Sequence, residues 1–118
     1  MDQEEKTLYN ITIQNPVDFI LESSKLRVEL IQPEWTEQLA RVLTYGAQKH
    51  GALSFLENNY NYSQLIGSYK RHLLNFEKGY DYDEETEELN LAHAATNILM
   101  LLTYKLRNKG VDDRNKID

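Results

Sequence analysis

The chain has 118 residues, of which 41% are hydrophobic and 27% are charged, the size and balance of one small folded domain. It contains no cysteine, and this excludes a disulfide framework, a thiolate zinc site and a cysteine nucleophile. The formal net charge is −6, and the scattered basic residues do not form the stripe that a duplex nucleic-acid binder needs.

No apolar run approaches the roughly 20 residues that span a bilayer. The acidic start, MDQEEKTLYN, lacks the basic and apolar regions of a signal peptide. We therefore expect a cytoplasmic protein whose partners include neither duplex nucleic acid nor a membrane.

The chain is expected to divide into an N-terminal arm at 1–24, one helical domain at 25–108 and a C-terminal tail at 109–118. Residues 7–13 are β-branched and partly alternating, which favours a short β-strand or an extended arm. The arm and the tail flank the segments in which apolar residues recur at helical spacing, from which the helices are predicted.

A first helix is predicted from Pro33 to about Lys49, ending near Gly51, because proline suits the first helical position. Its apolar residues recur at helical spacing: Trp35, Leu39, Val42, Leu43 and Gly46. Glu34 and Glu37 lie in its first turn, where the helix dipole alone would explain two carboxylates.

Residues 52–62, rich in Asn and Tyr, are predicted to be a loop. A second helix is predicted from the cap Ser63 to Lys78, with Gly79 ending it. An acidic segment follows, made of Asp81, Asp83, Glu84, Glu85, Glu87 and Glu88. These carboxylates are either a solvated loop or ligands for a divalent cation, since magnesium and manganese prefer hard oxygen ligands.

A third helix is predicted from the cap Thr86 to about Arg107, and it is apolar on nearly every side. A helix of that kind belongs in the middle of a bundle. With short connections between the helices, neighbours should run antiparallel. In a chain with only three helices, the third helix stays partly uncovered. We therefore expect an all-α bundle of three to four helices that is completed by forming an oligomer.

Three polar residues of this helix, Asn90, His93 and Asn97, are three and four residues apart and so share one face. Polar side chains in a buried helix are costly unless each has a partner. They are therefore either hydrogen-bonded within the core or part of a functional pocket, which His72 of the second helix would also face.

Four stretches in this order resemble a known family: SKLRVELIQPEW, ARVLTYGAQKHG, RHLLNFEKGYDYDEE and LNLAHAATNILMLL, over roughly residues 24–103. The family is the dATP/dGTP diphosphohydrolases common in phages, related to MazZ and to the all-α MazG-type nucleotide pyrophosphohydrolases. The resemblance implies a MazG-like helical bundle, a dimer or tetramer of identical chains, and the host cytoplasm if the chain is phage-encoded.

The activity that the resemblance implies is hydrolysis of a deoxynucleoside triphosphate of the dGTP/dATP class to the monophosphate and pyrophosphate. Mg²⁺ or Mn²⁺ would neutralise the triphosphate and activate water. The implied metal ligands are Glu34, Glu37, Asp81 and Asp83. Lys49, Arg71 and Asn97 would bind substrate, and His72 and His93 would orient water, bind phosphate or transfer protons.

Simpler explanations remain open for some of these residues. Glu37 can pair with Arg41 one turn away, and Lys49 and Arg71 can form ordinary ion pairs with the acidic segment.

Two departures from the family pattern support other functions. Tyr80 replaces a glutamate, and Asn90 replaces a histidine. The chain could then bind a nucleotide without cleaving it. A purely structural or regulatory oligomer is the third alternative, if the polar face of the third helix is fully paired.

Overall fold

The computed structural model describes residues 25–117. Its internal contacts divide the chain into two units, Met1–Gln32 and Pro33–Asp118. In the first unit, the described residues 25–32 contain one short 3-10 helix, η1 (Val28–Leu30), closed by a hydrogen bond from the Ile31 N–H to the Val28 carbonyl at 3.1 Å. The arm predicted over 1–24, with its strand at 7–13, lies outside the described residues.

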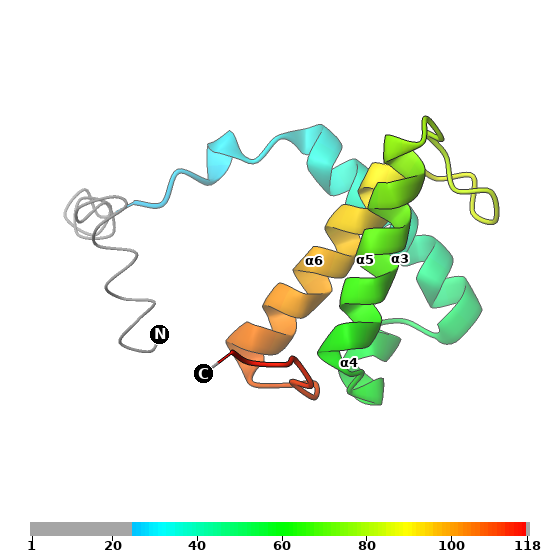
Figure 1. Ribbon diagram of the computed structural model, residues 1–118. Helices are drawn as coiled ribbons and strands as arrows, with labels where there is room; N and C mark the ends of the chain where they lie inside the picture. The colour runs from blue at the N-terminus through cyan, green and yellow to red at the C-terminus, as the bar shows by residue number, and fades with distance from the viewer. Residues whose placement is uncertain (1–24, 118) are drawn as a thin grey trace. The chain divides into compact units, whose positions relative to one another are not determined.

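The second unit is all-α, as predicted, and its elements are α3 (Pro33–His50), α4 (Ser54–Asn58), α5 (Tyr62–Glu77) and α6 (Asn90–Arg107) (Figure 1). Helices α5 and α6 lie side by side, and α3 packs against α6, so α6 is the central helix that its apolar sequence predicted. Among the described residues, none of the helices is long and apolar enough to cross a membrane.

Helix α3 begins at Pro33, as predicted, and extends one residue beyond the predicted end, to His50. Gly51 follows with a φ of +93°, a backbone conformation that glycine adopts without a side-chain clash, and its N–H donates to the Ala47 carbonyl at 2.9 Å. Val42 is buried, but Trp35 stays 56% exposed. A single chain thus covers only part of the apolar face of α3.

The segment predicted to be a loop at 52–62 contains α4, so that prediction is wrong in part. Leu53 and Asn59 flank this short helix, and both have left-handed backbone angles that turn the chain in and out of it. The helix is held from outside, because the Tyr104 hydroxyl donates a hydrogen bond to the Phe55 carbonyl. A long-range contact of this kind leaves no local pattern in the sequence.

Helix α5 is capped by Asn61 rather than by Ser63. The Asn61 N–H donates to Gln64 Oε1 at 2.8 Å, which closes the first turn. Ser63 instead donates from its N–H and its Oγ to the carboxylate of Asp113, at 2.9 and 2.5 Å. The described part of the C-terminal segment therefore folds back onto the start of α5.

Helix α6 begins at Asn90 and its cap position is Leu89, so the predicted cap Thr86 is wrong by three positions. The acidic segment forms its own turn, in which the Asp83 N–H donates to the Glu88 carbonyl at 2.7 Å and the Glu87 N–H donates to the Asp83 carbonyl at 2.8 Å. These bonds use the backbone that would otherwise have continued the helix toward Thr86.

Candidate functional site

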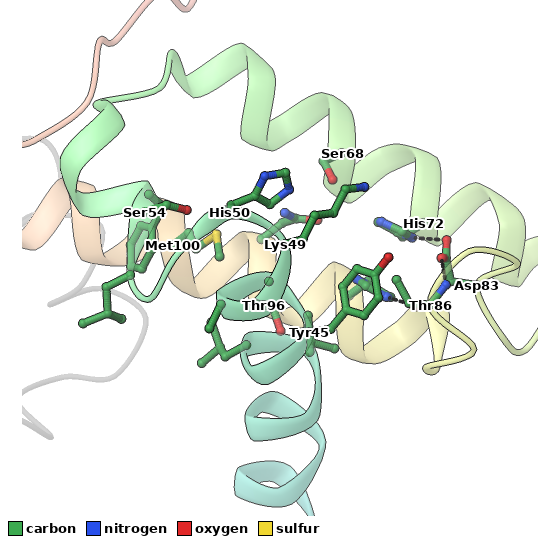
Figure 2. Close-up of a pocket in the computed structure, with 18 of the residues that line it drawn as sticks. Tyr45, Lys49, His50, Ser54, Ser68, His72, Asp83, Thr86, Thr96 and Met100 are labelled. Carbon is green, nitrogen blue, oxygen red and sulfur yellow. Dashed lines mark hydrogen bonds and ion pairs between the residues drawn. The ribbon is translucent and has the colours of Figure 1, made fainter.

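A cavity of about 340 Å³ opens between α3, α5, α6 and the acidic loop that joins α5 to α6 (Figure 2). Its size lies within the range of about 300–1,000 Å³ that small-molecule sites occupy. Each helix contributes two polar side chains four residues apart, which places them on one helix face. These pairs are Tyr45 and Lys49 on α3, Ser68 and His72 on α5, and His93 and Asn97 on α6. The loop contributes Asp83, Glu85 and Thr86.

His72 is held in one tautomer by Asn90. Asn90 is 1% exposed, and its Nδ2 donates to the Tyr80 carbonyl at 2.9 Å, which fixes the orientation of the amide. Asn90 Oδ1 then faces His72 Nδ1 at 3.0 Å, so Nδ1 carries the proton. In the neutral ring, Nε2 of His72 keeps the lone pair.

Asp83 is fixed by its own loop. Its Oδ2 accepts the N–H groups of Glu85 and Thr86 at 3.1 and 2.9 Å, and its Oδ1 lies 3.7 Å from His72 Nδ1. Burial acts to raise the pKa of Asp83, but the hydrogen bonds from Thr86 and the nearby imidazoles outweigh it and hold the pKa below its ordinary value. Asp83 is therefore an ionised carboxylate beside the imidazoles at neutral pH.

His93 stacks on His72, with ring centroids 4.4 Å apart and 9° between the ring planes. Burial, followed by the adjacent His72, lowers the pKa of His93 below its ordinary value, although Asp83 opposes the shift. Thr86 Oγ1 accepts the Glu88 N–H at 3.2 Å and lies 2.6 Å from His93 Nε2. Either the hydroxyl or the ring N–H can donate in this hydrogen bond, depending on the tautomer of His93.

Lys49 lies at the rim of the cavity and is paired with Glu85. Lys49 Nζ donates to Glu85 Oε1 at 2.5 Å, and the Tyr45 hydroxyl donates to the same oxygen at 3.2 Å. The hydrogen bond from Lys49 lowers the pKa of Glu85, and the bond to Glu85 raises the pKa of Lys49. Both side chains of this ion pair are well exposed, so the pair can separate at little cost when an anion enters.

Asn97, one turn beyond His93 on α6, has an unpaired amide. Its Oδ1 is buried and has no hydrogen-bond partner among the described residues. Such atoms are uncommon in folded proteins, because a buried acceptor without a donor loses its hydrogen bonds to water and gains none. Asn97 lines the cavity, so a rotation of its amide would bring this oxygen within reach of a donor on a ligand.

Several residues predicted from the sequence line this one cavity: Lys49, His72, Asp83, His93 and Asn97. The expectation that His72 faces the same pocket as His93 and Asn97 is confirmed. Asn90, the other polar residue on that face of α6, is buried beneath the cavity and supports His72.

The remaining predicted residues do not line the cavity: Glu34, Glu37, Arg71 and Asp81. Glu34 borders a separate apolar groove beside Trp35. The guanidinium of Arg71 folds back over Gly67, with Nη1 3.1 Å from the position that a Cβ would take there. Their roles as metal or substrate ligands stay predictions.

Of the ion pairs offered as simpler explanations for the candidate residues, one is present and another is not. Lys49 does form an ion pair with the acidic segment, through Glu85. Arg41 pairs with Glu88 at 2.7 Å across the fold, rather than forming the predicted salt bridge with Glu37 on its own helix.

The sequence does not single out Tyr45 or Thr86 as site residues, and it includes Glu85 only among the carboxylates of the acidic segment, but the structure places all three at the cavity. Tyr45 could have been found, because it lies one helical turn before Lys49 and hence on the same face. The positions of Glu85 and Thr86 depend on the turn built around Asp83, which helical spacing does not describe.

Two carboxylates, two stacked imidazoles and a lysine line one cavity of small-molecule size in this helical protein, and such a set is typical of ligand-binding and hydrolytic sites. The family model described as dATP/dGTP diphosphohydrolase, N-terminal, matches residues 18–114, and the chain belongs to this family.

A protein of Salmonella phage PMBT28 named dATP/dGTP diphosphohydrolase is 37% identical over 92 residues. The match covers 78% of this chain and 31% of that protein, so the chain spans about a third of the length of this curated relative. No solved structure matches the chain.

Proposed function

We propose that this chain hydrolyses a purine deoxynucleoside triphosphate to the monophosphate and pyrophosphate in the cavity between α3, α5 and α6. The observation that supports this most directly is the convergence of Asp83, His72 and His93 on one side of the cavity, with Lys49 at its rim. Membership of the dATP/dGTP diphosphohydrolase family supplies the substrate class.

In this proposal, Lys49 exchanges its contact with Glu85 for the phosphates of the substrate. His72 is the general base, because Asn90 holds its proton on Nδ1 and leaves the lone pair of Nε2 for the attacking water. When the ring takes up that proton, the Asp83 carboxylate 3.7 Å away stabilises the imidazolium. His93, stacked on the other side and kept neutral by burial, does not compete for the charge.

A divalent cation, Mg²⁺ or Mn²⁺, enters this proposal as part of the substrate, because triphosphates bind such ions through hard oxygens. The described residues contain no group of three or more His, Asp or Glu side chains that could hold a metal ion. The predicted ligands Glu34 and Glu37 lie on α3 away from the cavity that Asp83 lines. A resident metal therefore does not fit residues 25–117 of one chain, and we assign the cation only the neutralisation of substrate charge.

The proposal is tested by incubating the full chain with each dNTP and Mn²⁺ or Mg²⁺ and measuring pyrophosphate. We expect turnover of dATP, dGTP or both, and a loss on the order of a hundredfold or more for His72→Gln and Asp83→Asn. Glu84→Gln is the control, since Glu84 is an exposed neighbour that does not line the cavity. Equal activity of all three variants would contradict the assigned site.

A second candidate is nucleotide binding without cleavage. It is favoured by Asn90, which replaces the histidine of the family pattern and is fully used in holding His72 and the Tyr80 carbonyl. Dissociation constants for dATP and dGTP that lie in the micromolar range, without pyrophosphate release, would support this candidate over the first.

We also propose that two copies of the chain associate through an apolar groove between α3 and α6. The groove has a volume of about 620 Å³ and exposes large apolar side chains, including Trp35 at 56% and Ile98 at 44%. A central helix with its own apolar face uncovered is stabilised when a second copy excludes water from it. The same face in each copy would make a symmetric contact.

A further inference from the structure

Two asparagines on the same face of α6 differ in one respect. Both amide atoms of Asn90 are hydrogen-bonded, Nδ2 to the Tyr80 carbonyl and Oδ1 to His72, so its orientation is fixed. Within the described residues, Asn97 has neither: its buried Oδ1 is unpartnered, and no hydrogen bond involves its Nδ2. Oδ1 has almost no accessible surface in this orientation, but the last torsion of an asparagine is soft and no hydrogen bond fixes it here, so the Asn97 amide can rotate to bring Oδ1 to the cavity beside Nδ2.

The position of Asn97 within the cavity indicates which part of a nucleotide it meets. His93, with the charged groups of the phosphate-binding end, lies one helical turn away, about 6 Å along the axis. On the other side, the wall becomes apolar, formed by Leu43, Phe55 and Met100, which also border an adjoining cavity of about 150 Å³. A flat ring with polar edges suits such walls better than a sugar does.

We propose that Asn97 recognises the base of the substrate, and that one site accepts both adenine and guanine because no hydrogen bond fixes the orientation of the Asn97 amide. Adenine presents an amino donor at position 6 beside an acceptor at N1. Guanine presents the reverse arrangement, an acceptor at O6 beside a donor at N1. An amide carries one acceptor and one donor, so turning it over makes it complementary to either base.

This inference rests on the proposed function, since it assumes that purine nucleotides occupy the cavity. It also supplies the hydrogen-bond partner that the Asn97 Oδ1 lacks among the described residues. An amide held by a protein partner, as in Asn90, could match only one of the two purines.

The decisive variant is Asn97→Asp, which keeps the shape but has two acceptors and no donor. A carboxylate can accept from the N1–H and the 2-amino group of guanine together, whereas with adenine it faces the unprotonated N1. We expect the preference for dGTP over dATP, taken as the ratio of their dissociation constants and of their kcat/KM values, to rise about tenfold or more. Asn115→Asp, the same change at an exposed position, should leave the ratio unchanged.

A substrate analogue tests the wild-type chain without relying on a variant that folds. The triphosphate of 2′-deoxynebularine is dATP without its 6-amino group, so it keeps only the N1 acceptor for the Asn97 amide. It should bind about tenfold or more weakly than dATP. Asn97→Leu should weaken dATP more than it weakens this analogue.

Binding is measured by calorimetry with Mg²⁺ and turnover by pyrophosphate release, which separates this inference from the proposed function. Binding with the expected ratios but no pyrophosphate supports the inference and overturns the proposed hydrolysis. Turnover with ratios that Asn97→Asp does not change overturns the inference alone. A loss at Asn97→Leu that disappears with 2′,3′-dideoxy substrates would place the amide on the sugar and also overturn it. Failure of dATP and dGTP either to bind or to react overturns both.

Discussion

Asp83 has two carboxylate oxygens with separate tasks. Oδ2 holds the acidic loop in shape through two backbone N–H groups, and Oδ1 faces His72. Asn at this position retains one oxygen for the loop but removes the negative charge. The variant Asp83→Asn therefore tests the charge separately from the fold.

We predict that Asp83→Asn lowers the pKa of His93 further below its ordinary value. Burial and the charge of His72 already lower this pKa, and Asp83 is the first of the groups that raise it, so removing its charge removes an opposing effect. An NMR titration of the histidine ring signals measures the change, with Glu84→Gln as the control. An unchanged or higher pKa in Asp83→Asn would contradict the geometry.

Burial of His93 should also make folding stability depend on pH. Because the pKa of His93 in the folded chain lies below the ordinary histidine value of about 6.5, the unfolded chain binds more protons than the folded chain between these two values. The free energy of unfolding is then greatest above about pH 6.5 and falls as the pH drops through that window.

We expect urea unfolding to show a lower stability at pH 5.5 than at pH 7.5, and a smaller difference in His93→Gln. His50→Gln is the matched control, because His50 is exposed at the end of α3. The same pH difference in the wild type and in His93→Gln would show that another group is responsible.

Helical spacing could predict that His93 and Asn97 lie on one face of α6, because a face of a helix is fixed by residue number. It could not predict that Asn90 is buried and orients His72. That depends on the carbonyl of Tyr80, which reaches Asn90 through a loop that no periodicity describes.

At the scale of elements, the two wrong helix starts have one physical cause. Asn61 and Ser63 are both competent caps, and the choice between them was made by Asp113, fifty residues away from Ser63, which accepts its N–H and Oγ. Thr86 is also a competent cap, but it lies in the turn around Asp83. Local sequence identifies candidate caps, and hydrogen bonds to other side chains, near in the sequence or distant, select among them.

The end of α6 depends on a glycine that allows the chain to turn against a buried ring. Gly110 has a φ of +75°, and a Cβ added there would lie 2.4 Å from Cδ2 of Tyr104, which is 0% exposed. The next residue, Val111, joins the start of α5 through its N–H bond to the Tyr60 carbonyl at 3.1 Å. A shift at Gly110 would therefore disturb both helices.

We predict that Gly110→Ala destabilises the fold more than Gly79→Ala does. Gly79 also has a positive φ, +96°, but nothing lies within 4 Å of an added Cβ, so it carries only the backbone cost of about 1–2 kcal/mol. Overpacking against Tyr104 should add about 1–3 kcal/mol at Gly110. Urea unfolding of both variants measures the difference, and an equal loss would mean that the Tyr104 ring moves aside without cost.

At the scale of the whole molecule, the uncovered apolar surface distinguishes this chain from a domain that is complete alone. Of the large apolar side chains on α6, Leu91 is 46% exposed, Ile98 44% and Leu102 49%. The sequence could predict this surface, because a helix that is apolar all round exceeds what two neighbours of this length can cover. It could not predict which face stays open, since that depends on how α3 crosses α6.

We predict that the chain is a dimer in solution and that Ile98→Glu shifts it toward monomer. Burying a charge at the centre of an apolar contact is costly, whereas Ile98 is exposed enough in the single chain for the fold to tolerate the change. Gln48→Glu adds the same charge at an exposed position of α3 that does not line the groove. Light scattering after size-exclusion chromatography should give a lower mass for Ile98→Glu than for Gln48→Glu, with equal helix content by circular dichroism. Monomeric wild-type protein at all concentrations would mean that no second copy covers this groove.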